Sequence, residues 1–271
     1  KILHIFMRSN KQVIIIILLL LILVVLYLCF NKKENYENIV PRGINSFDKF
    51  FYINLEHRKD RKQQIENEFK NLGIDKNKVF RIDAIRNKYN GHIGAAKSHI
   101  KCITTAKQMG LRNVVIFEDD FKFGLPIEKI NENINKFLEK MGNNWDVLHL
   151  CSVFVNADKV EDLDIAKKVN HATGGIGYIV NNHFYDKLQN NIQLSINKME
   201  EEMKQLLKKN PDKKIFETQY AFDQNWQGLQ KVSKWYILDP LIGEHKDNGQ
   251  SSIMGNLEAF INLKNKYSLN V

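Results

Sequence analysis

Cysteine is scarce in this chain of 271 residues, and its three cysteines show no metal-binding spacing. Cys29, Cys102 and Cys151 lie far apart in the sequence, and no C-x-x-C pair occurs. The sequence therefore indicates neither a cysteine zinc site nor a disulfide framework. We expect Cys102 and Cys151 to be buried free thiols, in a helix and a strand, rather than a bridged pair.

The chain also lacks internal repeats and the phosphate-binding loop of nucleoside triphosphatases. The pattern G-x-x-x-x-G-K-[ST] is absent, and the glycine-rich segment 172–180 is not followed by a helix in the manner of dinucleotide-binding folds. Its glycines are expected to permit close approach of the backbone to a ligand or to a neighbouring element.

Charge of one sign is concentrated at the N-terminus. Five basic residues precede the first acid, Glu34, and supply five of the nine net positive charges, which leaves +4 for the rest of the chain. A mildly basic domain suits an anionic small molecule and gives little support for a nucleic-acid partner, so none is expected.

The longest apolar run covers residues 13–30, with Lys11 before it and Lys32 after it. As a helix it would span roughly 27 Å, close to the thickness of the hydrocarbon core of a bilayer. No small-x-small cleavage pattern follows the run, which predicts an uncleaved transmembrane signal anchor, with a cleaved signal peptide as the alternative. We therefore expect a single-pass membrane protein with its main domain on the non-cytosolic side.

This interpretation divides the chain into four parts: a tail (1–12), the anchor (13–30), a polar stem (31–46) and a globular domain (47–271). Within the domain, apolar segments predict strands at 49–55, 79–84, 113–117, 145–153 and 236–238, and the glycine-rich segment 172–180 is expected to lead into another strand. Helices are expected at 58–72, 94–109, 126–141, 182–188 and 196–209, and a polar loop at 243–247. The alternation predicts an α/β fold whose sheet is largely parallel in its first half.

The segment Val114–Phe121 contains the candidate ligand-binding residues of the predicted central strand. Four apolar residues, typical of a strand buried on both faces, are followed directly by Glu118, Asp119 and Asp120. Burying three unpaired carboxylates would cost a large free energy of desolvation. We therefore expect them at the carboxyl end of the strand, where open α/β sheets bind ligands. Clustered carboxylates favour a hard divalent cation, which commonly also binds phosphates. The alternative is a solvated acidic turn.

Four segments, in order, resemble glycosyltransferase family 25, which contains lipooligosaccharide and collagen galactosyltransferases. They are Tyr52–Leu55 with Arg58 and Arg61 (I-N-L-x-x-R-x-x-R), Gly91–His99 (G-x-I-G-C-x-x-S-H), Ile116–Asp120 (I-x-E-D-D) and Gly175–Val180 (G-Y-I). Together they cover about residues 47–253. Two positions depart from the family pattern: Ala95 replaces a cysteine, and Ile103 replaces a frequent tryptophan.

The resemblance implies a glycosyltransferase-A type nucleotide-sugar-binding fold, a UDP-sugar donor and a divalent metal, usually Mn²⁺. It suggests metal ligands at Glu118, Asp120 and, most loosely, His245, which follows the last predicted strand. Donor-binding residues would be Asn54, Arg58, Arg61, Asp83, Ser98, His99 and Asp119. Without the resemblance, the arginines would be solvating residues of a surface helix, and His99 a packing residue.

The resemblance further implies an inverting transfer of galactose or glucose to a hydroxyl of a glycan or protein. Such a transfer needs a base for the acceptor proton, and Asp223 is the first candidate, followed by Glu217. Asp223 as a helix N-cap is the alternative. Tyr178 and Trp226 would either stack on sugars or pack in the core. Two other functions stay open: a membrane-anchored nucleotide-sugar-binding protein without catalysis, and a metal-dependent phosphoesterase.

Overall fold

The computed structural model describes residues 19–24, 27, 43–215 and 218–245, in two compact units, 1–40 and 41–271. In the first unit, residues 19–24 and 27 are helical and exposed. The rest of the predicted anchor and most of the stem lie outside the described residues. Within the described ranges, no helix is both long and apolar enough to cross a membrane.

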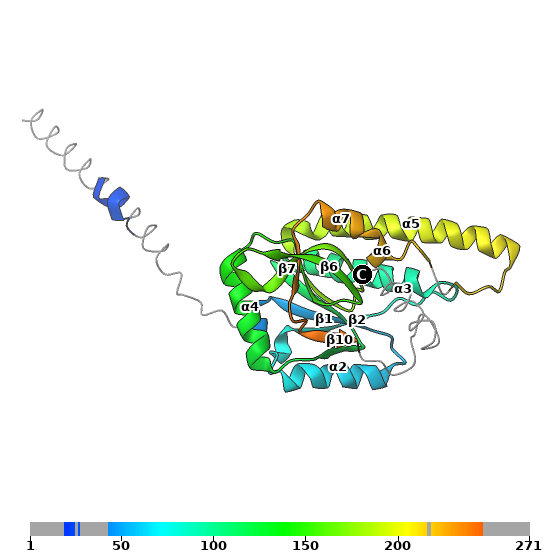
Figure 1. Ribbon diagram of the computed structural model, residues 1–271, viewed down its shortest axis with the longest axis horizontal. Coiled ribbons are helices and arrows are strands. Elements are labelled where there is room, and N and C mark those ends of the chain that lie inside the picture. The colour runs from blue at the N-terminus through cyan, green and yellow to red at the C-terminus, as the bar shows by residue number, and fades with distance from the viewer. Residues whose placement is uncertain (1–18, 25–26, 28–42, 216–217, 246–271) are drawn as a thin grey trace, which may run out of the picture. The chain divides into compact units, whose positions relative to one another are not determined.

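An eight-stranded mixed sheet forms the centre of the second unit, in the order β2-β1-β3-β8-β5-β9-β7-β6 (Figure 1). Strands β2, β1 and β3 are parallel; β8 is antiparallel to β3 and β5; β5 and β9 are parallel; and β7 and β6 add an antiparallel hairpin. The predicted α/β sheet with a parallel first half is confirmed. The bounds are β1 Lys49–Asn54, β2 Val79–Asp83, β3 Asn113–Glu118, β5 Val147–Cys151, β6 Phe154–Val160, β7 Leu163–Thr173, β8 Gly177–Asn181 and β9 Trp235–Leu238.

Helices cover both faces of the sheet, as Figure 1 shows, with α2 and α4 on one side and α3 and α5 on the other. The side chains of β3 alternate between the two cores: Val115 and Phe117 pack with the first pair of helices, Val114 and Ile116 with the second. This explains the unbroken apolar run before the acids. The helices are α2 Lys59–Asn71, α3 Gly91–Gln108, α4 Ile127–Met141, α5 Tyr185–Lys209, α6 Phe222–Asn225 and α7 Gln227–Lys231, with short 3₁₀ turns η1 Gly43–Ser46, η2 Lys76–Lys78 and η3 Asn182–Phe184.

A second, two-stranded sheet pairs β4 (Phe121–Phe123) with β10 (Gly243–His245) in antiparallel register. The prediction of a loop at 243–245 was therefore wrong. The polar sequence conceals this strand because its buried residue is a glycine: a Cβ on Gly243 would lie 2.2 Å from the ring of Phe121. The pairing places His245 opposite Phe121, the residue after the acidic triplet.

Three further differences separate the structure from the sequence-based expectations. The hairpin β6–β7 was not predicted, because its outer strand is mostly exposed or half-buried and carries charged residues. The glycine-rich segment 172–180 belongs to two strands instead of leading into one, since Ala172 and Thr173 end β7 and β8 begins at Gly177. Helix α5 is continuous where two helices were expected. Cys102 and Cys151 are buried free thiols, as predicted.

The stability of this fold should fall in mild acid because of His149 on β5. The residue is fully buried, in ring contact with Tyr178, Trp226 and Trp235, and burial lowers its pKa from 6.5 to about 3. Between these values the unfolded chain binds a proton that the folded chain excludes. His149 should therefore reduce the free energy of unfolding by about 1.4 kcal/mol for each pH unit below 6.5, with no effect above it.

Urea unfolding at pH 7, 6 and 5 measures this dependence. The His149→Leu variant serves as control, because other groups also titrate in this range. Below pH 6.5, the free energy of unfolding of this variant should fall by about 1.4 kcal/mol less per pH unit than that of the wild type. Equal slopes would contradict the assignment.

Candidate active site

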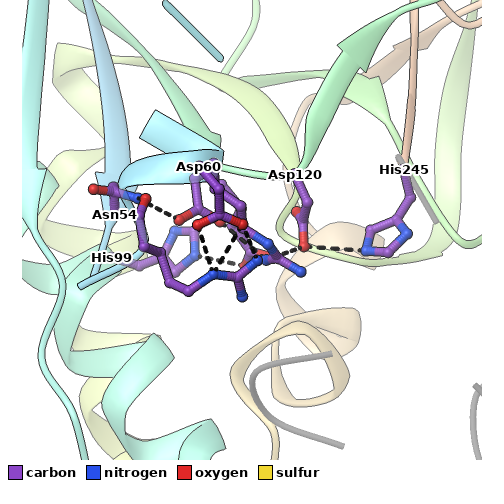
Figure 2. Close-up of polar contacts among 9 residues, drawn as sticks. Asn54, Asp60, His99, Asp120 and His245 are labelled. Carbon is purple, nitrogen blue, oxygen red and sulfur yellow. Dashed lines mark hydrogen bonds and ion pairs between the residues drawn. The ribbon is translucent and has the colours of Figure 1, made fainter. Parts of the chain in front are cut away.

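The acidic triplet lies at the carboxyl end of β3, with Glu118 closing the strand and Asp119 and Asp120 in the turn to β4. Asp119 and Asp120 are each 7% exposed, whereas the side chain of Glu118 is 28% exposed. Two carboxylates are thus buried at the edge where β1 and β3 end side by side. Figure 2 shows the polar side chains that gather around them.

Asp119 is held by two donors from neighbouring elements. The side-chain amide of Asn54, at the end of β1, donates to Oδ2 at 2.7 Å, and Nη1 of Arg61, on α2, donates to Oδ1 at 3.0 Å. Burial and the nearby charge of Asp120 raise the pKa of Asp119. The hydrogen bonds from Asn54 and Arg61 lower it, but the net shift is upward. With a donor on each oxygen, the carboxylate of Asp119 is held in one orientation.

Asp120 shares the same arginine and contacts a histidine from β10. Its Oδ2 accepts from Nη1 of Arg61 at 2.8 Å and lies 3.2 Å from Nε2 of His245 (Figure 2). Burial alone would raise the pKa of Asp120, but the hydrogen bond from His245 and the charges of His245 and Arg61 outweigh it, so the pKa is lowered. The same hydrogen bond raises the pKa of His245.

The other oxygen of Asp120, Oδ1, is buried and has no hydrogen-bond partner among the described residues. An unsatisfied buried carboxylate oxygen is costly, and a cation would satisfy it. Across the same residues, no three His, Cys, Asp or Glu side chains converge closely enough to form a preformed metal site. The unpartnered oxygen of Asp120 fits an ion that takes one or two protein carboxylates and completes its coordination with phosphate and water, as Mg²⁺-like ions do.

Several other candidate residues serve the framework around the acids. Arg58 forms an ion pair with Asp60 at 2.8 Å, and its backbone carbonyl accepts from Asn54. Asp83 pairs with Arg81, which also donates to the side-chain oxygen of Asn54 at 3.1 Å. The structure thus brings Asn54 and Arg61 into direct contact with the acids. Asp83 is connected to them through Arg81 and Asn54.

Ser98 and His99, on α3, have different surroundings. The Ser98 hydroxyl donates to the carbonyl of Gly94 and accepts from the backbone N–H of Ile85, both at 2.8 Å, so it fixes the loop that precedes the helix. His99 is fully buried, and its Nε2 lies 3.2 Å from Oε1 of Glu118. Only His99 of this pair contacts the acidic triplet.

Asp223 lies in the first turn of α6, and its Oδ2 accepts from the backbone N–H of Gly174 at 2.9 Å. The N-cap of α6 is Ala221, so the alternative of Asp223 as a cap does not hold. Burial is the largest influence on Asp223 and raises its pKa. The hydrogen bond from the Gly174 N–H and the charge of His92 lower the pKa, whereas the charge of Glu118 raises it further. Glu217, the second candidate base, lies outside the described residues.

The sequence analysis did not predict the site contacts of Arg81 and Tyr178. Arg81 was overlooked, although its two-residue spacing from Asp83 on a strand beside Asn54 would have indicated a shared face. Tyr178 and Trp226 are fully buried, which favours core packing over sugar stacking, yet the Tyr178 hydroxyl bonds to His99. The glycines before Tyr178 serve packing: a Cβ on Gly175 would lie 2.4 Å from the ring of Phe222.

Comparison with known proteins gives a distant similarity. No protein-family model matches the chain. Procollagen galactosyltransferase 1-A of Xenopus laevis is 24% identical over a match that covers 43% of this chain and 23% of the relative, so the chain spans less than a quarter of the length of that curated protein.

Among solved structures, a mannose-1-phosphate geranyltransferase from Thermus thermophilus aligns with a TM-score of 0.38 at 9% identity, covering 71% of this chain and 59% of the other. A glycosyltransferase involved in the glycosylation of the major capsid of PBCV-1 aligns with a TM-score of 0.36 at 7% identity, covering 70% and 92%. TM-scores this low do not establish a common fold.

Replacing Arg61 by Met should destabilise the protein strongly. The side chains of Arg61, Asp119 and Asp120 are all at least nine-tenths buried, and the substitution leaves two carboxylates without their shared cation. A loss of about 3 to 5 kcal/mol in the free energy of unfolding is expected, measured by urea denaturation. Lys62→Met, at the next position of α2, is the matched control: its ion pair with Glu66 is exposed, and a loss below about 1 kcal/mol is expected. Equal losses in the two variants would contradict the assigned role of Arg61.

Proposed function

We propose that the protein is a divalent-metal-dependent glycosyltransferase that uses a UDP-hexose donor. The observation that carries the proposal is the buried, unpartnered Oδ1 of Asp120 beside two further carboxylates at the carboxyl end of β3, in the part of the chain that the structure describes. Such an end of an α/β sheet is where ligands bind, and the unsatisfied oxygen suits a hard cation.

The proposed binding of the donor complex follows from the contacts. Asp120 would hold the cation through Oδ1, with Glu118 as a second carboxylate, while Arg61 and His245 keep the other oxygen of Asp120 in place. When bound, the cation would neutralise charge on the departing diphosphate. Asp119, fixed by Asn54 and Arg61, would orient the sugar.

The nature of the donor and the acceptor is proposed from similarity. The four sequence segments resemble family 25, and the distant relative in Xenopus laevis is named as a procollagen galactosyltransferase. Galactose or glucose as the transferred sugar, Mn²⁺ as the cation, and a glycan or protein hydroxyl as the acceptor are consistent with both. A membrane anchor before the domain, with the domain on the non-cytosolic side, belongs to the same proposal.

Asp223 is the proposed base of an inverting transfer. The Gly174 N–H holds its carboxylate, and its pKa, raised by burial, makes it a stronger proton acceptor than an exposed aspartate once it is ionised. It would take the proton of the acceptor hydroxyl as that oxygen bonds to the anomeric carbon and the UDP departs. The activity should therefore rise with pH through the raised pKa of Asp223.

The reaction class is tested by the release of UDP from a panel of UDP-sugars by the full chain. One UDP-hexose should be hydrolysed with Mn²⁺ and not with chelator. The Asp120→Asn variant, which removes the charge but keeps the shape, should lose the activity. Asp164→Asn, an exposed carboxylate on β7, should retain it. If Asp120→Asn turned over donor as fast as the wild type, the proposed metal site would be wrong.

The base is tested by Asp223→Asn, since the amide oxygen can still accept from Gly174 N–H. Transfer to an acceptor should fall by about 10²- to 10⁴-fold, while calorimetry shows unchanged binding of UDP with Mn²⁺. Transfer that survives within a few fold would exclude Asp223 as the base.

A further inference from the structure

A chain of three hydrogen-bonded side chains leads from the core to the acidic triplet. The hydroxyl of Tyr178, on β8, lies 2.8 Å from Nδ1 of His99, on α3, and Nε2 of His99 lies 3.2 Å from Oε1 of Glu118, at the end of β3. Tyr178 and His99 are both 0% exposed. Figure 2 shows His99 near the buried acids.

The His99 ring is confined on its sides as well as at its nitrogens. The ring of Phe222 lies 4.4 Å from it, centroid to centroid, and Tyr178 stacks at 5.7 Å. A Cβ on Gly175 would lie 2.4 Å from the ring of Phe222, so only glycine leaves Phe222 its present place against His99. Because interiors are close-packed, the ring cannot turn away from Glu118 without displacing Phe222 or Tyr178.

The proton positions follow from hydrogen-bond satisfaction. If the Tyr178 hydroxyl donates to Nδ1, then Nε2 carries the imidazole proton and donates to the Glu118 carboxylate, and every donor has an acceptor. The opposite tautomer would direct a lone pair of Nε2 at an anionic oxygen and leave the buried hydroxyl proton of Tyr178 without an acceptor among the described side chains. The first arrangement is therefore the stable one.

We propose that Tyr178 and His99 are positioning residues, which hold Glu118 by one carboxylate oxygen in the orientation that the donor-bound cation requires. The inference rests on the proposed function, because it assigns a purpose to a residue of that same site. Partners behind a metal ligand fix its orientation, and their loss typically weakens metal binding by about 10- to 100-fold.

The first test measures the tautomer in the metal-free full chain by NMR, with ¹⁵N-labelled histidine and assignment by His99→Gln. We expect the Nε2 atom of His99 to carry a proton. In Tyr178→Phe, which keeps the ring but removes the hydroxyl, the Nδ1 resonance should shift because its donor is lost. A predominant Nδ1–H form in the wild type would overturn the proposal, whatever the protein's activity.

The second test measures the affinity for Mn²⁺ in the presence of UDP, by calorimetry. Tyr178→Phe should bind Mn²⁺ about tenfold or more weakly, with the KM for Mn²⁺ raised more than kcat is lowered. Tyr185→Phe is the matched control: Tyr185 is in the same core, its hydroxyl is buried, and it has no hydrogen-bond partner among the described residues. This variant should bind like the wild type.

The outcomes separate the two claims. If the wild type binds Mn²⁺ with UDP and both variants bind equally well, the positioning role is wrong and the proposed function stands. If the wild type binds no Mn²⁺ with UDP, the metal-dependent function is wrong, and the role assigned to Glu118 is overturned with it.

Discussion

The structure depends on how two buried carboxylates are compensated at the end of β3. Asp119 and Asp120 follow a strand that is buried on both faces, and an uncompensated charge there would cost several kcal/mol. Arg61 bridges both with one nitrogen. Because the guanidinium is itself buried, its helix α2 must pack where it does, and Asn54 and His245 then supply the remaining contacts. Of the four carboxylate oxygens of Asp119 and Asp120, only Oδ1 of Asp120 has no hydrogen-bond partner among the described residues.

Segments far apart in the sequence meet at this point, which accounts for the arrangement of the domain. The parallel pair β1 and β3 brings Asn54 beside the acids, and the small sheet of β4 and β10 returns the chain so that His245 reaches Asp120. On the other side, α3 and β8 place His99 and Tyr178 behind Glu118. The acids are thus held from both layers of helices.

Much of this was predictable from the sequence, and the rest was not, for physical reasons. The apolar run before Glu118 identified the central strand because burial on both faces leaves no alternation, and the acids could then lie only at its end. By contrast, β10 was missed because its strand character comes from Gly243 packing on Phe121, a contact between distant segments. The role of Tyr178 was hidden in the same way: a buried aromatic residue gives no sequence signal that its hydroxyl is used.

The most direct test of the central claim is the position of the cation. Crystals of the full chain grown with Mn²⁺ and UDP, measured at a wavelength where manganese scatters anomalously, would locate the ion without reference to activity. We expect an anomalous peak within bonding distance of Oδ1 of Asp120 and of the diphosphate, with Arg61 still hydrogen-bonded to Oδ2. A peak away from the acidic triplet, or UDP bound with Asp120 uncoordinated, would contradict it.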